Sequence, residues 1–476
     1  MDNKLLFEKS KADRRATVIC VNASCNIDAK YARKSKLKLP QIAEVDLVRH
    51  YMGLSRKAHG VSNGFYPLGS CTMKYNPATN EAIASLKNFT HIHPLQPQAS
   101  MQGTLEVMHD LAKSLCKITG MHDITLQPAA GAHGELTALM MIKAFHRDHG
   151  EANRNIVLVP DSAHGTNPAS ATMLGYEIKV IPSDFQGMVD IDILKKVADK
   201  NVAALMLTNP NTLGIFEKNI SKIARIIHDV GGKLYHDGAN MNAIMGITRP
   251  GDMGFDVMHL NLHKTFSTPH GGGGPGSGPV GCSKALSQYL PNPRVVKTES
   301  GYALEDSDMS IGKVKSFYGN FLVNLRAYTY ILSLGKQGLK DTSKNAVLNA
   351  NYMKHRLKDS FSMSHDGLCK HEFVMSAQKL KDETGINALD IAKTLLDYGI
   401  HPPTVYFPQI VPEAMMVEPT ETESKETLDH ACDILIEIAN RAYKNPDELK
   451  ATPTTLSVSR LDETLAARKP VIKFDK

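Results

Sequence analysis

Short apolar runs alternate with helix-type patterns across residues 100–330, and this alternation is what most constrains the fold. The apolar runs predict strands at 156–159, 178–181, 202–207, 233–235, 257–262 and 278–282. The helix-type patterns between them lie at 134–149, 190–199 and 219–230. Because such alternation is typical of parallel strands joined by crossover helices, we predict an α/β fold with a mostly parallel, doubly wound sheet.

The chain divides into three parts around this pattern. Residues 1–100 predict an N-terminal arm followed by an extended segment in which prolines are frequent. Residues 101–335 form the predicted large domain, and residues 336–476 a smaller C-terminal α+β domain. Helices at 320–334 and 341–357 lead into the smaller domain, where we expect a strand at 371–375 and helices near 388–398 and 424–442.

The charge and cysteine content argue against several classes of protein. A formal net charge of +6 over 476 residues, without a Lys/Arg block interleaved with aromatic residues, argues against nucleic-acid binding. The seven scattered cysteines contain no C-x-x-C pair, which argues against a disulfide framework and against a metal site. No apolar run approaches the roughly 20 residues of a membrane span. We therefore expect a cytoplasmic protein that binds neither nucleic acid nor membrane.

Lys264 follows the apolar run at 257–262 and is the first candidate catalytic residue. A lysine at the carboxyl end of a strand lies where open α/β sheets bind their ligands. If it is partly desolvated there, its pKa falls and the neutral amine attacks a carbonyl to form a Schiff base. A surface lysine that ends a strand is the alternative, and this segment alone does not exclude it.

The glycine-rich stretch after Lys264 allows a second interpretation. Gly271, Gly273 and Gly276 satisfy the G-x-G-x-x-G spacing of dinucleotide-binding loops. That motif must follow a strand and open a helix, whereas prolines flank these glycines and a strand-like run follows. We interpret the stretch as a flexible loop of the same site.

Two earlier segments place small residues at the ends of predicted elements. Gly131, Ala132 and His133 run into a helical pattern, and the N–H groups at a helix start bind phosphate when small residues allow close approach. His164 follows the strand at 156–159, and its ring there could lie flat on a cofactor ring. Each feature alone is also typical of an ordinary loop.

Two further strands end in polar residues that suit a pyridine ring. Asp237 ends one strand and is followed by Ala239, which is small enough to lie beneath a ring. Asn209 ends the preceding strand and is placed to bond a phenolic oxygen. An aspartate that keeps a pyridine nitrogen protonated makes the ring an electron sink, as pyridoxal phosphate requires. The order of these residues, with Lys264 last, is that of fold-type I enzymes, so we predict pyridoxal phosphate as the cofactor.

Several longer motifs resemble those of the glycine-cleavage P-protein, glycine dehydrogenase (decarboxylating). The motif G-F-Y-P-L-G-S-C-T-M-K-Y-N-P occupies residues 64–77. The other motifs lie at 128–135, 164–169, 261–266, 316–321 and 416–425. Some forms of this enzyme are a single longer chain whose N-terminal half lacks the cofactor lysine. The present chain therefore resembles the lysine-bearing β subunit, subunit 2, of the split form.

The resemblance implies a reaction and its partners. Glycine would replace Lys264 on the cofactor, lose CO2 and pass its aminomethyl group to the lipoyl arm of H-protein. A separate α subunit, subunit 1, would complete the enzyme in an (αβ)2 tetramer. His133, His263 and His270 are candidates for the final proton transfer, and Cys71 is either an inert buried thiol or a redox group.

The residues by themselves leave other activities open. Their chemistry equally allows an aminotransferase, a desulfurase or another amino-acid decarboxylase. A pyridoxal-free scaffold subunit is the alternative from a different class of protein. The complete set of lysine, aspartate and histidine argues against a scaffold.

Overall fold

The computed structural model describes residues 4–16, 27–35, 37–270 and 276–472. By their contacts the residues form two units, Met1–Asn63 and Gly64–Lys476. The glycines at 271 and 273 lie outside the described residues, so the interpretation of the glycine-rich loop stays a prediction. The division of the chain at residues 100 and 335 also stays a prediction.

The first unit contains two helices without a buried residue, α1 (Leu6–Lys9) and α2 (Glu44–Ser55). In α2 the apolar side chains of Val48 and Tyr51 are more than half exposed, at 53% and 55%. The Arg14 guanidinium forms an ion pair with Asp46, at 2.9 Å. A helix whose apolar side chains find no core within its own unit is typical of an arm that packs against another surface.

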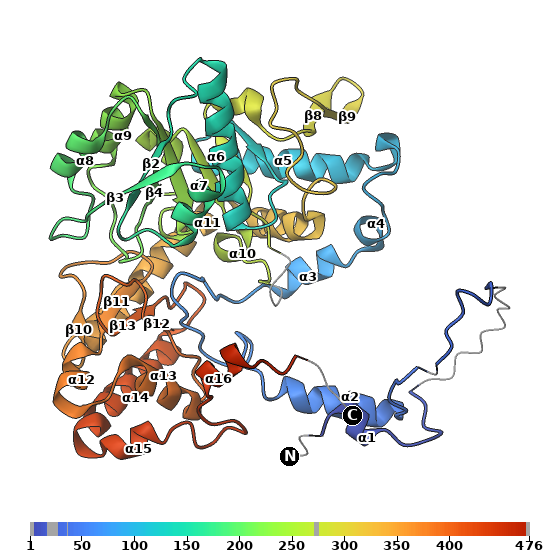
Figure 1. Cartoon of the computed structure of the whole chain (residues 1–476), viewed down its shortest axis with the longest axis vertical. Helices are drawn as coiled ribbons and strands as arrows, with labels where there is room; N and C mark the ends of the chain where they lie inside the picture. Colours follow the sequence, from blue (N-terminus) through green and yellow to red (C-terminus); the bar gives the residue numbers. More distant parts are fainter. Residues whose placement is uncertain (1–3, 17–26, 36, 271–275, 473–476) are drawn as a thin grey trace. The chain divides into compact units, whose positions relative to one another are not determined.

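A seven-stranded sheet forms the centre of the second unit (Figure 1). In spatial order the strands are β1 (Asp123–Thr125), β7 (Val280–Cys282), β6 (Val257–Leu260), β5 (Lys233–Gly238), β4 (Val202–Thr208), β2 (Ile156–Pro160) and β3 (Glu177–Ile181). The neighbours from β3 to β6 run parallel, whereas β7 is antiparallel to both β6 and β1. The predicted α/β fold with a mostly parallel sheet is confirmed.

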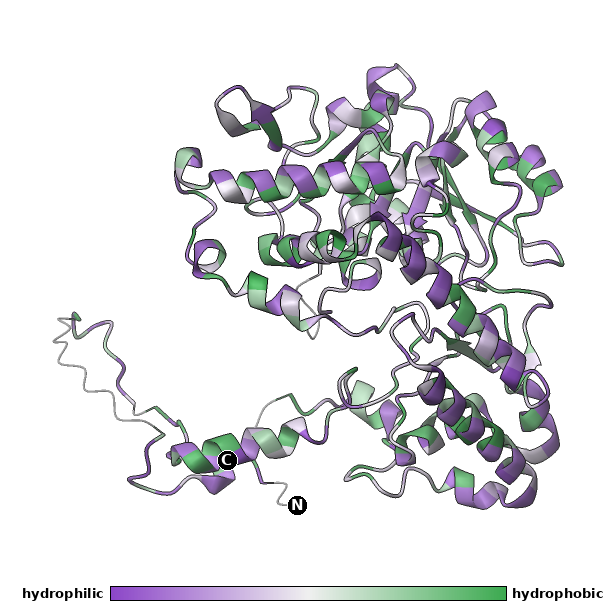
Figure 2. Cartoon of the chain, turned by 180° about the vertical axis from the view of Figure 1, so that it is seen from behind, coloured by the Kyte–Doolittle hydropathy of each residue, from purple (hydrophilic) through white to green (hydrophobic). Residues whose placement is uncertain are grey.

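The sheet is buried on both faces because side chains of its central strands alternate between two cores. In β4, Leu205 and Leu207 belong to one core, and Ala204 and Met206 belong to the other. The first core is completed by α5 (Gln102–Thr119), α8 (Ile191–Val197) and α9 (Ile220–Asp229). The second is completed by α6 (Gly131–Asp148) and α7 (Thr166–Met173). Hydrophobic and hydrophilic residues alternate along α5 in Figure 2, as expected for a helix with one buried face.

A long helix, α11 (Phe321–Leu357), leads from the large sheet to a smaller C-terminal domain. Its backbone is non-helical at Gly335 (φ 60°, ψ −174°), which separates the two helices predicted from the sequence. The small sheet is antiparallel, in the order β10 (Ser362–Met363), β11 (Phe373–Ser376), β13 (Ala414–Val417) and β12 (Thr404–Val405). The accompanying helices are α12 (Gln378–Thr384), α13 (Ala388–Asp397), α14 (Lys425–Lys444), α15 (Pro446–Lys450) and α16 (Glu463–Arg468). The strand and helices predicted for this domain correspond to β11, α13 and α14.

Two local predictions need correction. Strand β6 ends at Leu260 and the short helix α10 (Leu262–Thr265) follows, so Lys264 lies on a helical turn and not at a strand end. The segment 61–100 was expected to be extended, but α3 (Ala78–Ala84) and α4 (Lys87–Thr90) interrupt it. In both places tertiary packing decides a short stretch whose local pattern is ambiguous.

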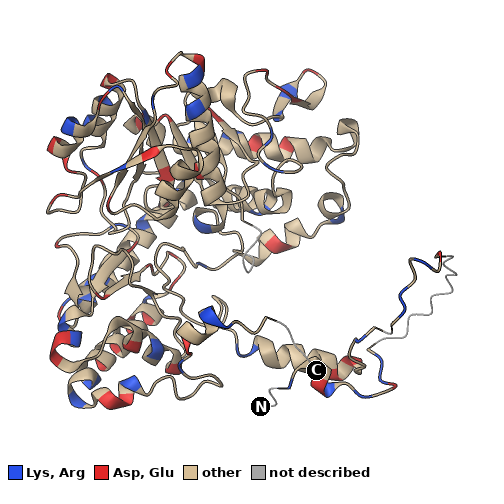
Figure 3. Cartoon of the chain, viewed as in Figure 1, with Lys and Arg blue, Asp and Glu red and all other residues tan. Residues whose placement is uncertain are grey.

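Charged residues of both signs are interspersed over the outer helices of the second unit (Figure 3). This mixture accords with the small net charge of the chain. None of the described helices combines the length and the apolar content that crossing a membrane requires.

Candidate active site

A cavity of about 190 Å³ lies at the carboxyl ends of the central strands and contains Lys264 in its wall. The register of the sheet creates this arrangement, because Thr208 of β4 pairs with Asp237 of β5, which pairs with His259 of β6. Residues of all three strand ends therefore face one space. Of the residues predicted from the sequence, the cavity is lined by Gly131, Ala132, His164, Asp237, Ala239, His263 and Lys264.

Lys264 is presented by α10, which begins directly after β6. The Lys264 N–H donates to the carbonyl of Asn261 at 3.0 Å. On its other side, the carbonyl of Thr265 accepts a hydrogen bond from the buried ammonium of Lys74 at 2.8 Å. These contacts hold the backbone on both sides of the lysine, so its amine enters the cavity from a fixed point.

Asp237 is a buried carboxylate at the end of β5. Its Oδ2 accepts a hydrogen bond from Asn167 Nδ2 at 3.0 Å, and its Oδ1 accepts one from the Ala239 N–H at 3.0 Å. Burial favours the neutral acid, but His259 and these hydrogen bonds outweigh it and lower the pKa of Asp237. The group is therefore ionised and ready to pair with a protonated ring nitrogen.

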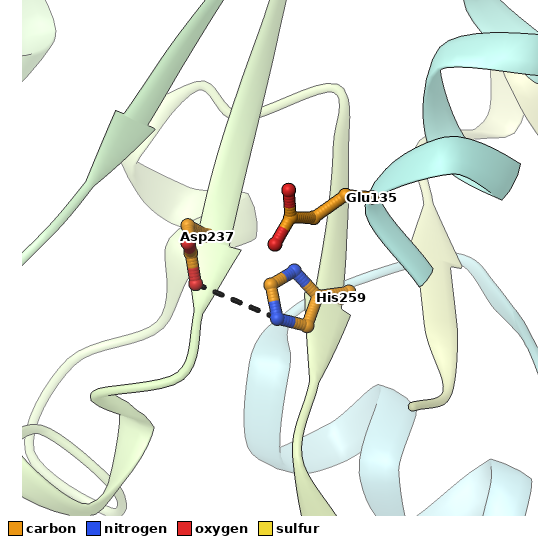
Figure 4. Close-up of side chains that lie close together, drawn as sticks. All are labelled: Glu135, Asp237 and His259. Atoms are coloured by element: carbon orange, nitrogen blue, oxygen red, sulfur yellow. Dashed lines mark ion pairs between the residues drawn. The ribbon is translucent and has the colours of Figure 1, made fainter. Parts of the chain in front are cut away.

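His259 and Glu135 accompany Asp237 and were not identified from the sequence (Figure 4). The three side chains offer atoms that lie within 4.8 Å of one another. His259 Nε2 is 3.5 Å from Asp237 Oδ1. Two features of the sequence could have indicated these residues. One is a histidine inside an otherwise apolar strand, and the other is a glutamate in the first turns of the helix that begins at the predicted phosphate loop.

The tautomer of His259 follows from its second partner. Its Nδ1 lies 2.5 Å from the hydroxyl of Tyr235. Burial raises the pKa of Tyr235 well above its ordinary value, so the phenol stays protonated and its hydroxyl donates a hydrogen bond to Nδ1. Burial also lowers the pKa of His259, which leaves the ring neutral with its remaining proton on Nε2, toward Asp237.

Glu135 lies on α6 and is almost fully buried. Its carboxyl group accepts hydrogen bonds from the hydroxyls of Thr166 at 2.7 Å and Ser170 at 3.2 Å. Burial, followed by the charge of Asp237, raises the pKa of Glu135 to about 7. The same Thr166 hydroxyl is 2.8 Å from His164 Nδ1, so the exposed ring of His164 is tied to the wall of the cavity.

Two predicted residues are not brought to the cavity. Asn209 is fully buried, and its side-chain oxygen accepts a hydrogen bond from the Glu217 N–H at 2.9 Å. Its neighbour Thr208 lines the cavity instead, with a hydroxyl that has no hydrogen-bond partner. His133 Nδ1 accepts a hydrogen bond from the Ala129 N–H at 3.1 Å, outside the cavity.

His263 is the histidine candidate for proton transfer that lines the cavity. Burial, His270 and the charge of Lys264 lower the pKa of His263 to about 3. Its ring centroid is 5.1 Å from that of His270, in an edge-to-face arrangement. His263 is therefore neutral near pH 7, and its buried Nδ1 has no hydrogen-bond partner.

The cavity has the groups that pyridoxal phosphate needs. Helix α6 begins at its edge and has no capping side chain, so its first N–H groups are available to a phosphate. A Cβ added at Gly131 would come within 2.4 Å of Asn261 Oδ1, so a larger residue here would have to displace the Asn261 side chain. Asn261 Oδ1 and Thr208 Oγ1 are buried without a partner, as expected for atoms that face a bound polar group.

Comparison with known protein families gives matches over most of the chain. Residues 22–301 match the family described as glycine cleavage system P-protein. Residues 342–456 match the C-terminal domain of glycine dehydrogenase.

Two relatives that match over almost the full length of the chain have the same name. A probable glycine dehydrogenase (decarboxylating) subunit 2 from Treponema denticola is 58% identical over 474 residues, which cover 99% of this chain and 98% of that protein. A protein of the same name from Staphylococcus saprophyticus is 59% identical over 478 residues, which cover 99% and 97%.

Solved structures share the fold at low sequence identity. An inhibitor-bound glycine decarboxylase (P-protein) of the glycine cleavage system aligns with a TM-score of 0.71 at 18% identity, covering 87% of this chain and 93% of that one. Glutamate decarboxylase from Lactobacillus brevis aligns with a TM-score of 0.67 at 13% identity, covering 88% and 97%.

Proposed function

The chain belongs to the glycine cleavage system P-protein family, and from this premise we propose that it decarboxylates glycine and passes the aminomethyl group to lipoylated H-protein. The observation that carries the proposal is a single cavity that combines Lys264, the ionised Asp237 and the uncapped start of α6. An amine nucleophile, a carboxylate for a ring nitrogen and an anion site are the three protein groups that pyridoxal phosphate chemistry requires.

Bound pyridoxal phosphate supplies an aldehyde that captures an amine and a ring that accepts the electron pair left by departing CO2. Lys264 would hold the cofactor through its aldehyde, and Gly131 and Ala132 would bind the phosphate through backbone N–H groups. Asp237 would keep the proton on the ring nitrogen, while His164 and Ala239 would flank the ring. The Asp237–His259 contact would keep that carboxylate oriented.

The proton that completes the reaction needs a neutral acceptor or donor at the cavity. Of the three histidine candidates, His263 lines the cavity, and we propose it for this role. His133 and His270 do not line the cavity, and their roles stay predictions. The role of Asn209 at the phenolic oxygen also stays a prediction, and Thr208 is the polar side chain of that strand end on the wall.

As subunit 2 of a two-subunit enzyme, the chain has a subunit 1 partner. We infer that the two form an (αβ)2 tetramer. The support comes from the first unit, whose helices α1 and α2 bury no residue of their own. We place the enzyme in the cytoplasm, where the thiols of the described cysteines, all free, would stay reduced.

The proposed function is tested by release of labelled CO2 from glycine. The chain would be assayed alone, with subunit 1, and with subunit 1 and lipoylated H-protein. We expect a yellow protein, a borohydride-fixed pyridoxyl group on Lys264, and full turnover only in the complete mixture. Lys264→Ala should lose both the fixed group and turnover. Fixation on another lysine would contradict the site, and full turnover without subunit 1 would contradict the assembly.

A further inference from the structure

The loop from Gly69 to Thr72 joins the small-domain sheet to the cavity wall. Ser70 lines the cavity, while Gly69 packs against Met416, whose Cγ would be 2.2 Å from an added Cβ. The Thr404 hydroxyl donates to the Gly69 carbonyl at 2.8 Å. Ser70 and Thr72 have left-handed φ values of 60° and 53°. Residues with a Cβ keep this conformation only where surrounding contacts hold it.

Two fully buried glutamates of the small domain supply those contacts. Glu372 Oε2 accepts a hydrogen bond from the Ser70 N–H at 2.8 Å. Glu418 accepts hydrogen bonds from the Thr72 N–H at 2.9 Å and the Thr72 hydroxyl at 2.5 Å. Asn242 Nδ2 donates to the same Glu418 at 3.1 Å. The N–H of each left-handed residue therefore has its own carboxyl partner.

The two carboxyl groups play different parts. Among the described residues, no Lys or Arg forms an ion pair with either, and His371 Nε2 lies 3.7 Å from Glu372 and 3.9 Å from Glu418. Glu418 accepts three hydrogen bonds, which occupy both of its oxygens. Burial and the neighbouring Glu418 raise the pKa of Glu372 well above its ordinary value, so Glu372 is a neutral acid.

We propose that Glu372 and Glu418 are positioning residues that clasp the 69–72 loop and thereby place Ser70 against the substrate amino acid. With Ser70 held in this position, the cavity admits only an amino acid whose substituent at the α-carbon is small enough. The clasp, meaning the contacts of Glu372 and Glu418 with the 69–72 loop, therefore sets this size limit. Its volume of about 190 Å³ is small beside the range of about 300–1,000 Å³ typical of ligand pockets. Displacement of one wall residue therefore changes what fits. The inference rests on the proposed function, since it concerns the substrate side of the same cavity.

The test uses the asymmetry between the two glutamates. Glu418→Gln replaces an acceptor oxygen by an NH2 group that faces donors, so the clasp opens. Glu372→Ala also opens it, whereas Glu372→Gln keeps a carbonyl acceptor for the Ser70 N–H. The control is Glu413→Gln, a small-domain glutamate that accepts the Ala388 N–H at 3.0 Å and lies outside the cavity wall.

Each variant would be purified with subunit 1, loaded with pyridoxal phosphate, and titrated with glycine and with alanine by cofactor absorbance. For Glu418→Gln and Glu372→Ala we expect the half-saturating glycine concentration to rise about tenfold. The preference for glycine over alanine should fall while cofactor affinity is kept. Glu372→Gln should restore most of both, and Glu413→Gln should match the unmodified chain. Unchanged glycine affinity and preference in Glu418→Gln and Glu372→Ala would overturn the proposal.

A second variant keeps the proposal testable if the buried substitutions unfold the chain. Ser70→Gly leaves the clasp in place and suits the left-handed backbone. It should raise alanine binding relative to glycine, and an unchanged preference would overturn the size-setting role. If the unmodified chain fixes the cofactor on a lysine other than Lys264, the proposed function fails and the inference with it. Normal binding in the unmodified chain with unresponsive variants would refute the inference alone.

Discussion

Replacement of the buried ammonium of Lys74 should be among the most costly single changes in this chain. Lys74 Nζ donates to Glu421 Oε1 at 2.7 Å, to the Thr265 carbonyl at 2.8 Å and to the Tyr330 hydroxyl at 3.1 Å. The side chains of Lys74 and Glu421 are 1% and 8% exposed. Lys74→Met keeps the apolar stem but removes the ammonium from Glu421 and from the Thr265 carbonyl, and the Tyr330 hydroxyl at 3.3 Å is then the remaining donor to Glu421 Oε1.

The expected loss follows from the geometry of this pair. Removal of one partner from a buried ion pair costs about 3–5 kcal/mol, because the remaining charge stays buried and unpaired. Burial lowers the pKa of Lys74, but Glu421 and Tyr330 more than offset this, and the net pKa is raised. A raised pKa means that the contribution of the ammonium is fully present at pH 7 and is lost only as the pH rises through the folded-state pKa.

The assay is urea denaturation at pH 7 of Lys74→Met, Glu421→Gln and the double variant. We expect the double variant to be more stable than the sum of the single changes predicts, by about 1–3 kcal/mol. The control is Lys195→Met, which removes an exposed pair with Asp192 at 3.4 Å and should cost under about 0.5 kcal/mol. A loss for Lys74→Met as small as that of the control, or strict additivity in the cycle, would refute the reasoning.

Two other predictions concern Asp237 and Glu135, the two carboxyl groups of the cavity wall. Asp237→Asn removes the charge that we propose holds the ring-nitrogen proton, so glycine decarboxylation should fall at least about 100-fold while cofactor binding changes less. Near-normal release of labelled CO2 would mean that another group holds the ring nitrogen. Burial and Asp237 raise the pKa of Glu135 from 4.5 to about 7, so folding takes up a proton there. The stability of the cofactor-free chain should then fall as the pH rises between these values. Glu135→Gln should lose this slope in thermal unfolding against pH, and an unchanged slope would assign it to another group.

The fold class and most of the proposed cofactor site can be predicted from patterns in the sequence. Alternating strand and helix patterns imply a parallel sheet, and in such a sheet the carboxyl ends of the strands share one edge. Asp237 and Lys264 each follow an apolar run, so the sequence predicts that they lie close together at this edge of the sheet. His164 and the start of α6 follow from the same rule.

The direction of individual side chains depends on tertiary packing and could not be predicted from the sequence. Asn209 follows its strand as predicted and its side-chain oxygen accepts a hydrogen bond from the Glu217 N–H, while its Nδ2 has no partner and the preceding Thr208 lines the cavity. Successive residues of extended chain point to opposite sides, so the sequence alone does not show which of two neighbours faces the cavity. Lys264 on α10 shows the same limit, since a period-2 pattern and a short helix look alike over a few residues.

Contacts between distant parts of the chain were also beyond the sequence. Glu372 and Glu418 hold Ser70 and Thr72 across sequence separations of 302 and 346 residues. Local periodicity predicts only whether a residue is buried or exposed. No local pattern indicates which distant residue a buried glutamate will contact. Its partner is set by how two separately patterned domains pack together, which is why the clasp on the 69–72 loop became visible only in three dimensions.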